Sequence, residues 1–145
     1  MEFKEYYDIN FNKTITEVIK KLSKKEDEIL KPFSLTHSHA KYIENIHRFK
    51  VVTMMDLTEL SGTDKANTTR VVKDLLNLGI VQKSGGERKF NLTLTEKGEQ
   101  IAEIFSNKKR DFLKVVLKDF TKEEIQMFKV LLEKLFIGTS SALKG

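Results

Sequence analysis

Residues 65–73 combine side-chain types that can hydrogen-bond to bases and phosphates. Helical spacing places five of them on one outward face: Ala66, Asn67, Thr69, Arg70 and Lys73. Asparagine pairs well with adenine and arginine with guanine, and threonine can contact either bases or backbone. The small alanine lets a neighbour approach closely. This polar and basic face predicts a helix that reads DNA.

The opposite face of the same stretch predicts how the helix is held. Thr68, Val71, Val72 and Leu75 follow one another at i, i+3, i+4 and i+7, the spacing that places side chains against a core. We therefore expect a helix over residues 65–78, ended by Gly79.

The preceding segment predicts a short helix of two turns. Thr53 can cap this helix, with Asp56 three residues later acting on the exposed amides of the first turn. Leu57 and Leu60 are expected to face inward, and Gly62 supplies the C-terminal stop. One of the next two residues caps the following helix. The order is helix, tight turn, helix, as in a helix-turn-helix unit.

A two-stranded hairpin is expected after the second helix. Residues 80–83 form the first strand, and residues 90–94 alternate apolar and polar side chains as a half-buried return strand does. The glycines at 85 and 86 permit a tight turn between them. Arg88 and Lys89 give the tip a positive charge, which suits a DNA minor groove because its negative potential favours arginine.

Further helices are expected on both sides of this unit. Apolar residues recur at helical spacing from about residue 12 to residue 31, where Pro32 ends the pattern, and again from Thr36 to about residue 49. In the second of these helices, the residues expected to face inward are Ala40, Ile43, Ile46 and Tyr42. After the hairpin, Thr95 begins a helix to about residue 118. Thr121 and Glu124 form a capping box for a last helix that reaches about residue 136.

The last helix carries more apolar surface than one flank of a 145-residue monomer should need. Four apolar side chains form one stripe along this helix: Ile125, Phe128, Leu132 and Leu135. Three more widen the stripe: Met127, Val130 and Leu131. Terminal helices of this kind usually bury the surplus against another subunit, and a two-fold dimer is the commonest arrangement. Coverage by the helix's own chain is the alternative.

Composition limits the class of protein further. The net charge is +5, and residues 64–98 alone hold seven basic against four acidic side chains, a modest signal for a polyanionic partner. The absence of cysteine excludes disulfides and zinc–thiolate sites. No apolar run approaches the roughly 20 residues of a membrane span, so we expect a soluble cytoplasmic protein without membrane contact.

The sequence groups no residues for catalysis or cofactor binding. His37, His39 and His47 include no i, i+4 pair, so we expect surface or packing roles, and a metal site would need ligands from elsewhere in the fold. The sequence shows no nucleophile paired with a general base, no phosphate-binding loop and no cofactor-binding motif. The interpretation is therefore a binding protein without a cofactor, and not an enzyme.

The ordered set of segments resembles the MarR family of bacterial transcriptional regulators over nearly the whole chain. The matching segments are Leu35-Thr36, residues 64–72, Leu75 with Gly79-Ile80-Val81, Glu87-Arg88, and residues 94–98. Two positions depart from the family pattern. Glu87 stands where the family commonly has aspartate, which leaves open whether a carboxylate braces Arg88. Thr68 replaces an aliphatic residue, which is expected to loosen its helix slightly.

The resemblance implies a mainly α fold with a small β wing. It implies a single domain over residues 1–145, with a winged helix-turn-helix at 35–98 and dimerisation helices at 1–34 and 99–145. It also implies a homodimer that binds double-stranded DNA at a pseudo-palindromic operator. Family members are usually repressors, and a small-molecule effector or another signal releases them.

Within this interpretation, eight residues are expected to contact DNA. Those expected at major-groove bases are Asn67, Thr69 and Arg70, with Ala66 beside them; those expected at phosphates are Lys65 and Lys73; those expected in the minor groove are Arg88 and Lys89. The alternative is a winged-helix module that binds protein or RNA. That alternative predicts an apolar outer face on the second helix, whereas the sequence shows a polar one.

Overall fold

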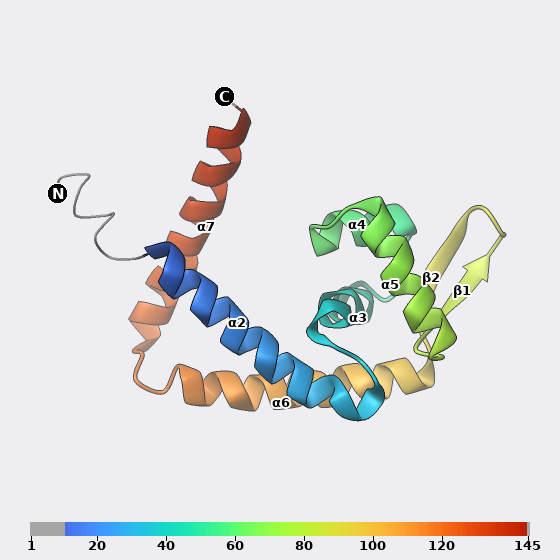
Figure 1. Ribbon diagram of the computed structural model, residues 1–145, viewed down its shortest axis with the longest axis horizontal. Helices are drawn as coiled ribbons and strands as arrows, with labels where there is room; N and C mark the ends of the chain where they lie inside the picture. Colours follow the sequence, from blue (N-terminus) through green and yellow to red (C-terminus); the bar gives the residue numbers. More distant parts are fainter. Residues whose placement is uncertain (1–10, 145) are drawn as a thin grey trace. The chain divides into compact units, whose positions relative to one another are not determined.

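A computed structural model describes residues 11–144, which divide into two compact units at residues 109 and 110. Residues 1–10, the start of the expected N-terminal dimerisation segment, and residue 145 lie outside the described residues. The elements are α2 (Phe11–Leu30), η1 (Lys31–Phe33), α3 (His37–Phe49), α4 (Met54–Ser61), α5 (Lys65–Asn77), β1 (Val81–Gly85), β2 (Phe90–Leu94), α6 (Glu96–Val116) and α7 (Lys122–Lys144) (Figure 1). The predicted fold class, mainly α with a small β wing, is confirmed.

Local capping sets the two helices of the helix-turn-helix. Thr53 Oγ1 accepts a hydrogen bond of 3.0 Å from the backbone N–H of Asp56, whose carboxylate accepts one of 3.0 Å in return. The bond from the backbone of Thr53 is the main cause that lowers the pKa of Asp56. Gly62 ends α4 in the left-handed region at φ 64°, and Asp64 caps α5. These boundaries agree with the expected ones.

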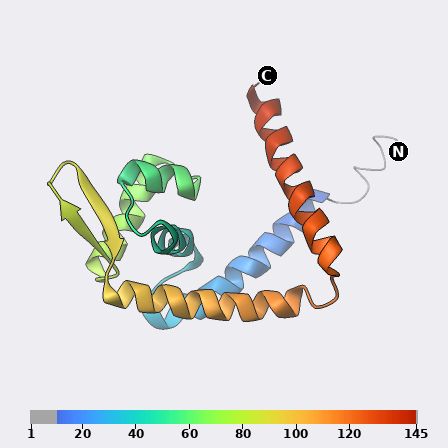
Figure 2. The ribbon, with the colours of Figure 1, turned by 180° about the vertical axis from the view of Figure 1, so that it is seen from behind.

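Helix α3 forms the centre of the unit that ends at residue 109. It contacts α2, α4, α5 and β2, and both views show it enclosed by these elements (Figures 1 and 2). The residues predicted to face inward on α3 are buried: Ala40, Tyr42, Ile43 and Ile46. They pack in one cluster with buried side chains of α4, α5, the hairpin and α6.

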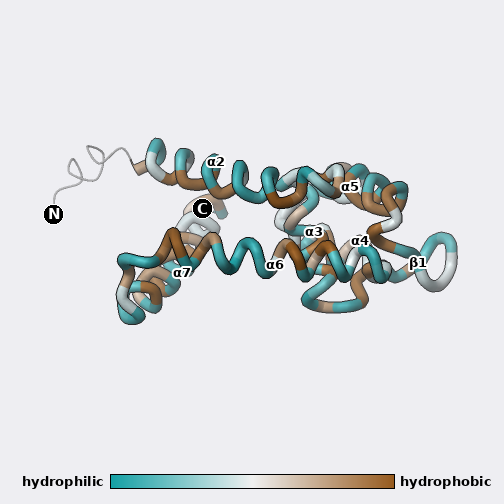
Figure 3. Tube along the Cα trace, turned by 90° about the horizontal axis from the view of Figure 1, so that it is seen from below, coloured by the Kyte–Doolittle hydropathy of each residue, from teal (hydrophilic) through white to brown (hydrophobic). Residues whose placement is uncertain are grey.

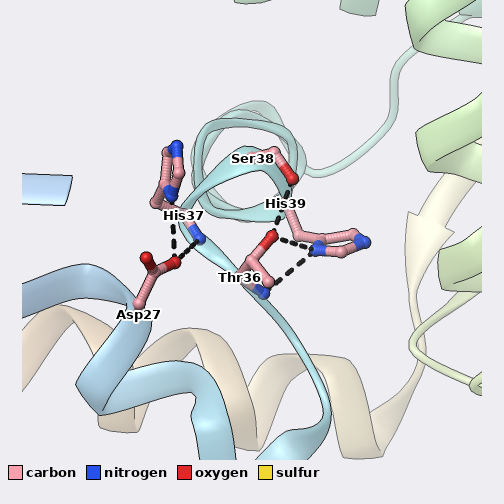
Figure 4. Close-up of polar contacts among 5 residues, drawn as sticks. All are labelled: Asp27, Thr36, His37, Ser38 and His39. Atoms are coloured by element: carbon pink, nitrogen blue, oxygen red, sulfur yellow. Dashed lines mark hydrogen bonds and ion pairs between the residues drawn. The ribbon is translucent and has the colours of Figure 1, made fainter. Parts of the chain in front are cut away.

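The first turn of α3 is fixed by its own histidines (Figure 4). The backbone N–H of His37 donates to Asp27 Oδ1 at 2.7 Å, and its ring Nδ1 lies 2.9 Å from the same oxygen. These bonds hold the pKa of Asp27 below its usual value, the backbone bond having the largest effect. The backbone N–H of Thr36 donates to Nδ1 of His39 at 3.1 Å. The histidines therefore join α3 to neighbouring segments, as their expected packing role requires.

The hairpin is antiparallel, with Val81 opposite Leu94 and Gly85 opposite Phe90. Its first strand begins one residue later than expected and continues to Gly85, because the pairing extends to the residue before the turn. Leu92 and Leu94 are buried as the alternation predicts, and Val52 adds a two-bond bridge to Leu92. The hairpin is therefore tied to the segment before α4.

Two predictions about individual elements are wrong. Leu60 was expected to face inward, but its side chain is 42% exposed, because the short helix α4 turns the faces of Leu57 and Ser61 to the core. The last helix was expected to end near residue 136, but α7 continues to Lys144. Gly138 lowers helix propensity without adding the steric block that a proline would, so the helix runs through it.

Helix α7 buries none of its residues in the single chain. The predicted apolar stripe is about half exposed, from 41% at Leu135 to 58% at Met127 among its exposed members, and hydrophobic colour recurs along the helix in Figure 3. Thr121 and Glu124 form the expected capping box at its start, with bonds of 2.9 and 3.0 Å. Among residues 11–144, no helix has the length and apolar content to span a bilayer.

Candidate nucleic-acid interface

Helix α5 turns two chemically different faces in opposite directions. Its apolar stripe is buried as predicted, with Val71 and Leu75 fully inaccessible. The expected DNA-facing residues Ala66, Thr69, Arg70 and Lys73 are all exposed, and so is Lys65 in the first turn. Asn67 is half-buried. The helix thus presents a polar and basic surface while its other side fills the core.

Bonds at both ends hold α5 in place. At its start, Asp64 Oδ1 accepts a 2.7 Å hydrogen bond from the backbone N–H of Asn67. Near its end, the carboxylate of Asp74 lies 3.3 Å from Nε2 of the buried His39 on α3. Because Nδ1 of His39 accepts a bond from Thr36, its proton lies on Nε2 and is donated to Asp74. These contacts fix the direction in which the polar face points.

The threonine that replaces an aliphatic residue in the buried stripe is fully accommodated. Thr68 has no exposed surface, and its hydroxyl donates to the carbonyl oxygen of Asp64 at 3.0 Å. Oγ1 of Thr68 in turn accepts a bond of 2.9 Å from the hydroxyl of Thr58 on α4. A buried hydroxyl costs free energy only when it lacks partners, and this one has them. Thr68 therefore bonds α5 to α4 across the tight turn.

Asn67 faces both the interior and the surface. Its side-chain Nδ2 donates to the hydroxyl of Tyr42 on α3 at 2.9 Å. Its Oδ1 accepts a bond of 2.6 Å from Nη2 of Arg70, one turn further along the exposed face. The amide that was expected to contact bases is thus bonded on both sides within the protein, and Arg70 is tethered to it.

The wing projects three charged residues from its turn. Glu87, Arg88 and Lys89 are exposed, and within residues 11–144 neither Arg88 nor Glu87 has an ion-pair or hydrogen-bonding partner. The carboxylate of Glu87 therefore does not brace Arg88 in this structure. Behind the tip, the ammonium of Lys83 lies 4.3 Å from the centre of the Phe90 ring, which supports the base of the hairpin.

Several cations of α5 and the wing remain available to an anion. In the described part of the chain, none of the following makes an ion pair: Lys65, Arg70, Lys73, Arg88 and Lys89. Lysine and arginine without carboxylate partners can neutralise phosphates and release their counterions. The structure places these cations on α5 and on the hairpin that contacts it.

Tyr42 is the functional candidate that the sequence interpretation did not identify. The sequence predicted only that it faces inward, and its side chain has no exposed surface. A buried tyrosine hydroxyl nearly always needs a hydrogen-bonding partner, and this requirement was the available signal. Its partners come from residues 21 and 25 positions away, which helical periodicity does not reveal.

Metal-binding geometry does not occur in the same region. Within residues 11–144, no three side chains of histidine, cysteine, aspartate or glutamate gather as ligands. Each histidine instead has a single carboxylate neighbour: Asp27 for His37, Asp74 for His39 and Glu99 for His47.

Comparisons with known proteins match this architecture. No family model matches the chain. It is 27% identical over 114 residues to the HTH-type transcriptional regulator BilQ of Clostridioides difficile (strain CD3), an alignment that covers 77% of this chain and 75% of that protein. Two solved structures share its fold. A MarR family protein from Bacillus stearothermophilus has a TM-score of 0.74 at 25% identity, covering 97% of this chain and 99% of the other. A mutant MarR from E. coli, complexed with operator DNA, has a TM-score of 0.77 at 22% identity, covering 93% and 99%.

The order of α4, α5 and the hairpin, the polar outer face of α5 and these likenesses lead to one assignment. The chain has the winged helix-turn-helix fold of solved MarR family structures and is similar in sequence to an HTH-type transcriptional regulator.

Proposed function

We propose that this protein binds double-stranded DNA sequence-specifically as a homodimer and regulates transcription from the bound site. The observation that carries the proposal is the two-faced helix α5, whose inner stripe is fully buried while Thr69, Arg70 and Lys73 are exposed on its outer side. An α-helix of this kind fits the major groove, where arginine can pair with guanine and short polar side chains reach base edges or phosphates.

The wing supports the same proposal. Its tip is narrow, because four residues join β1 to β2, and the side chains of Arg88 and Lys89 have no bonding partners among the described residues. A cationic finger beside a recognition helix can enter the neighbouring minor groove, where the negative potential favours arginine. The solved E. coli MarR that shares this fold is complexed with operator DNA.

Dimerisation supplies the second recognition helix. Helix α7 exposes large apolar side chains along its length, including Phe128, Leu132 and Phe136, and buries none of its residues in the single chain. A second copy of the chain covers such a surface with the same surface under two-fold symmetry. Two recognition helices spaced about 34 Å apart, one turn of DNA, then read a pseudo-palindromic site.

The family resemblance extends the proposal to a repressor that a small-molecule effector releases from its operator. The single-domain organisation, with residues 35–98 as the DNA-binding part and residues 1–34 and 99–145 as dimerisation segments, belongs to the same proposal. Transcription from a promoter that carries the preferred site, measured with and without the protein, distinguishes repression from activation.

Selection from a pool of synthetic duplexes with a random central region tests the DNA-binding function. We expect enriched sequences with two inverted half-sites whose centres lie about 10 base pairs apart. A pool that remains random after repeated selection would contradict sequence-specific binding. Recovery of RNA or protein partners together with a random duplex pool would favour the winged-helix module without DNA specificity.

A further inference from the structure

A chain of hydrogen bonds runs from the interior of the unit that ends at residue 109 to the exposed face of α5. It begins at hydroxyl groups between α4 and α5, passes through Tyr42 of α3 and Asn67 of α5, and ends at the guanidinium of Arg70. Tyr42 itself has no exposed surface and lies where DNA does not reach it.

One direction of donation satisfies every hydroxyl of this chain and also the guanidinium of Arg70, which carries donors only. The hydroxyl hydrogen of Thr68 is donated to the carbonyl oxygen of Asp64, so its oxygen, 3.4 Å from Oγ1 of Thr63, accepts there. Thr63 then donates to Thr68 and accepts from Tyr42. Since the single hydrogen of Tyr42 is used, its oxygen accepts from Nδ2 of Asn67. The amide nitrogen of Asn67 therefore points inward.

The orientation of that amide decides what the surface presents. With Nδ2 turned to Tyr42, Oδ1 of Asn67 points outward and accepts from Arg70 Nη2 at 2.6 Å. A flipped amide would oppose N–H groups to the guanidinium, which carries donors only. The contact with Arg70 thus selects the amide orientation, and the hydroxyl oxygen of Tyr42 holds the amide in it by accepting from Nδ2.

We propose that Tyr42 is a positioning residue for base recognition, which acts through Asn67 to hold the guanidinium of Arg70 in place on the outer face of α5. The inference rests on the proposed DNA-binding function and names which residue reads the base. Both polar atoms of the Asn67 side chain are bonded within the protein, and its Oδ1 holds the guanidinium of Arg70. Arg70 keeps four of its five N–H donors free of this bond, which is enough for the O6 and N7 acceptors of guanine.

Preorganisation gives this arrangement its effect on recognition. A free arginine loses rotamer freedom when it pairs with a base, and tethering the side chain beforehand reduces that loss. Removing the tether should therefore weaken discrimination at the base that Arg70 contacts, with little change in general attraction to phosphates, because the charge stays in place.

The test uses the full chain and the duplex that the wild-type protein selects from a random pool. Arg70→Ala first identifies the base pair whose preference depends on Arg70. Tyr42→Phe, which removes one hydroxyl and keeps the ring, should then lower the preference at that base pair by about 3- to 10-fold, the loss expected for one hydrogen bond. Affinity for a duplex of unrelated sequence should change by less than about 2-fold, because the cations remain.

A double-mutant comparison separates positioning from general damage. If Tyr42 acts through Arg70, Tyr42→Phe has no further effect on base preference in the Arg70→Ala background. Thr58→Val is the matched control, since it removes a hydroxyl at the far end of the same chain without touching Tyr42 or Asn67. Each variant is measured at the same number of degrees below its own melting temperature.

Three results would overturn the proposal: wild-type base preference in Tyr42→Phe, an equal further loss in the Arg70→Ala background, or the same loss of preference in Thr58→Val. A failure of the proposed function is different and easily recognised. In that case the wild-type protein itself selects no duplex, and both the function and the positioning role of Tyr42 are rejected.

Discussion

Gly98, in the first turn of α6, lies so close to Ile80 that a β-carbon on the glycine would stand 2.1 Å from the carbonyl oxygen of Ile80. That oxygen also accepts bonds from the backbone and hydroxyl of Thr95, so it cannot move without loss. The absence of a side chain at position 98 is therefore what lets α6 pack against the end of α5 and the start of the wing.

Gly98→Ala should destabilise the protein by about 1–3 kcal/mol, because the new methyl group overpacks against backbone. Thermal unfolding followed by circular dichroism measures the effect. Gly86→Ala is the control, since its β-carbon would meet Lys89 at an ordinary 3.5 Å. An unchanged melting temperature for Gly98→Ala would show that the close approach to Ile80 does not exist.

Arg70 and Lys73 should contribute to DNA binding in different ways. Arg70→Ala should lower affinity for the selected duplex by about 1–3 kcal/mol and blur one base position, whereas Lys73→Ala should weaken binding evenly and reduce the salt slope by about one. Fluorescence anisotropy over a range of salt concentrations measures both. Equal losses of Arg70→Ala on selected and unrelated duplexes would contradict a base-reading role.

The apolar face of α7 should form the subunit interface. Leu132, at 49% exposure, lies in the predicted stripe, and Leu132→Glu would place a charge in the covered surface. We expect the dimer dissociation constant to rise by more than about 10-fold, measured by sedimentation. Lys129→Glu adds the same side chain to the polar side of the helix and should leave the dimer intact. If the wild-type protein is a monomer at micromolar concentration, the proposed dimer interface is contradicted.

Lys109 should stabilise the unit that ends at residue 109 more at neutral pH than at acid pH. Its ammonium lies 3.1 Å from Glu44 and 3.9 Å from Glu26, whose pKa is raised by burial while Lys109 opposes the rise. In Lys109→Met the pKa of Glu26 should rise further. When folding raises the pKa of a carboxyl group, the free energy of unfolding falls as the pH rises from the unfolded-state pKa to the folded-state pKa. The variant should therefore lose most stability at a pH where Glu26 is charged.

We therefore expect Lys109→Met to lose about 1 kcal/mol near pH 7 and less near pH 4, where Glu26 takes up a proton. Urea unfolding at the two pH values measures the difference. Lys108→Met changes the neighbouring exposed lysine and serves as the control. A loss that is larger at pH 4 would contradict the assigned role of Lys109.

The sequence predicted best what depends on neighbours in the chain. The capping pairs of Thr53 with Asp56 and Thr121 with Glu124 connect residues three apart, so they are visible without the fold. Leu60 shows the limit, because periodicity gives a face of a helix but not how far the core extends along two turns. The length of α7 failed for a similar reason, since Gly138 weakens a helix without ending it.

The site shows the same division. Exposure of Arg70 and Lys73 followed from spacing alone, and the structure places both on the outer face of α5. The inward bond of Asn67 did not follow, because its partner Tyr42 lies 25 residues earlier and meets it only when α3 packs against α5. Whether the eight expected residues contact DNA stays a prediction.

Binding of the full chain to its selected duplex, measured against a scrambled duplex and an RNA duplex of the same sequence, tests the central claim most directly. The two-faced helix and the cationic wing predict tighter binding to the selected DNA, by about 10³-fold or more over the scrambled DNA, and affinities that fall steeply with salt. Equal affinity for all three nucleic acids, or no binding at low ionic strength, would contradict it.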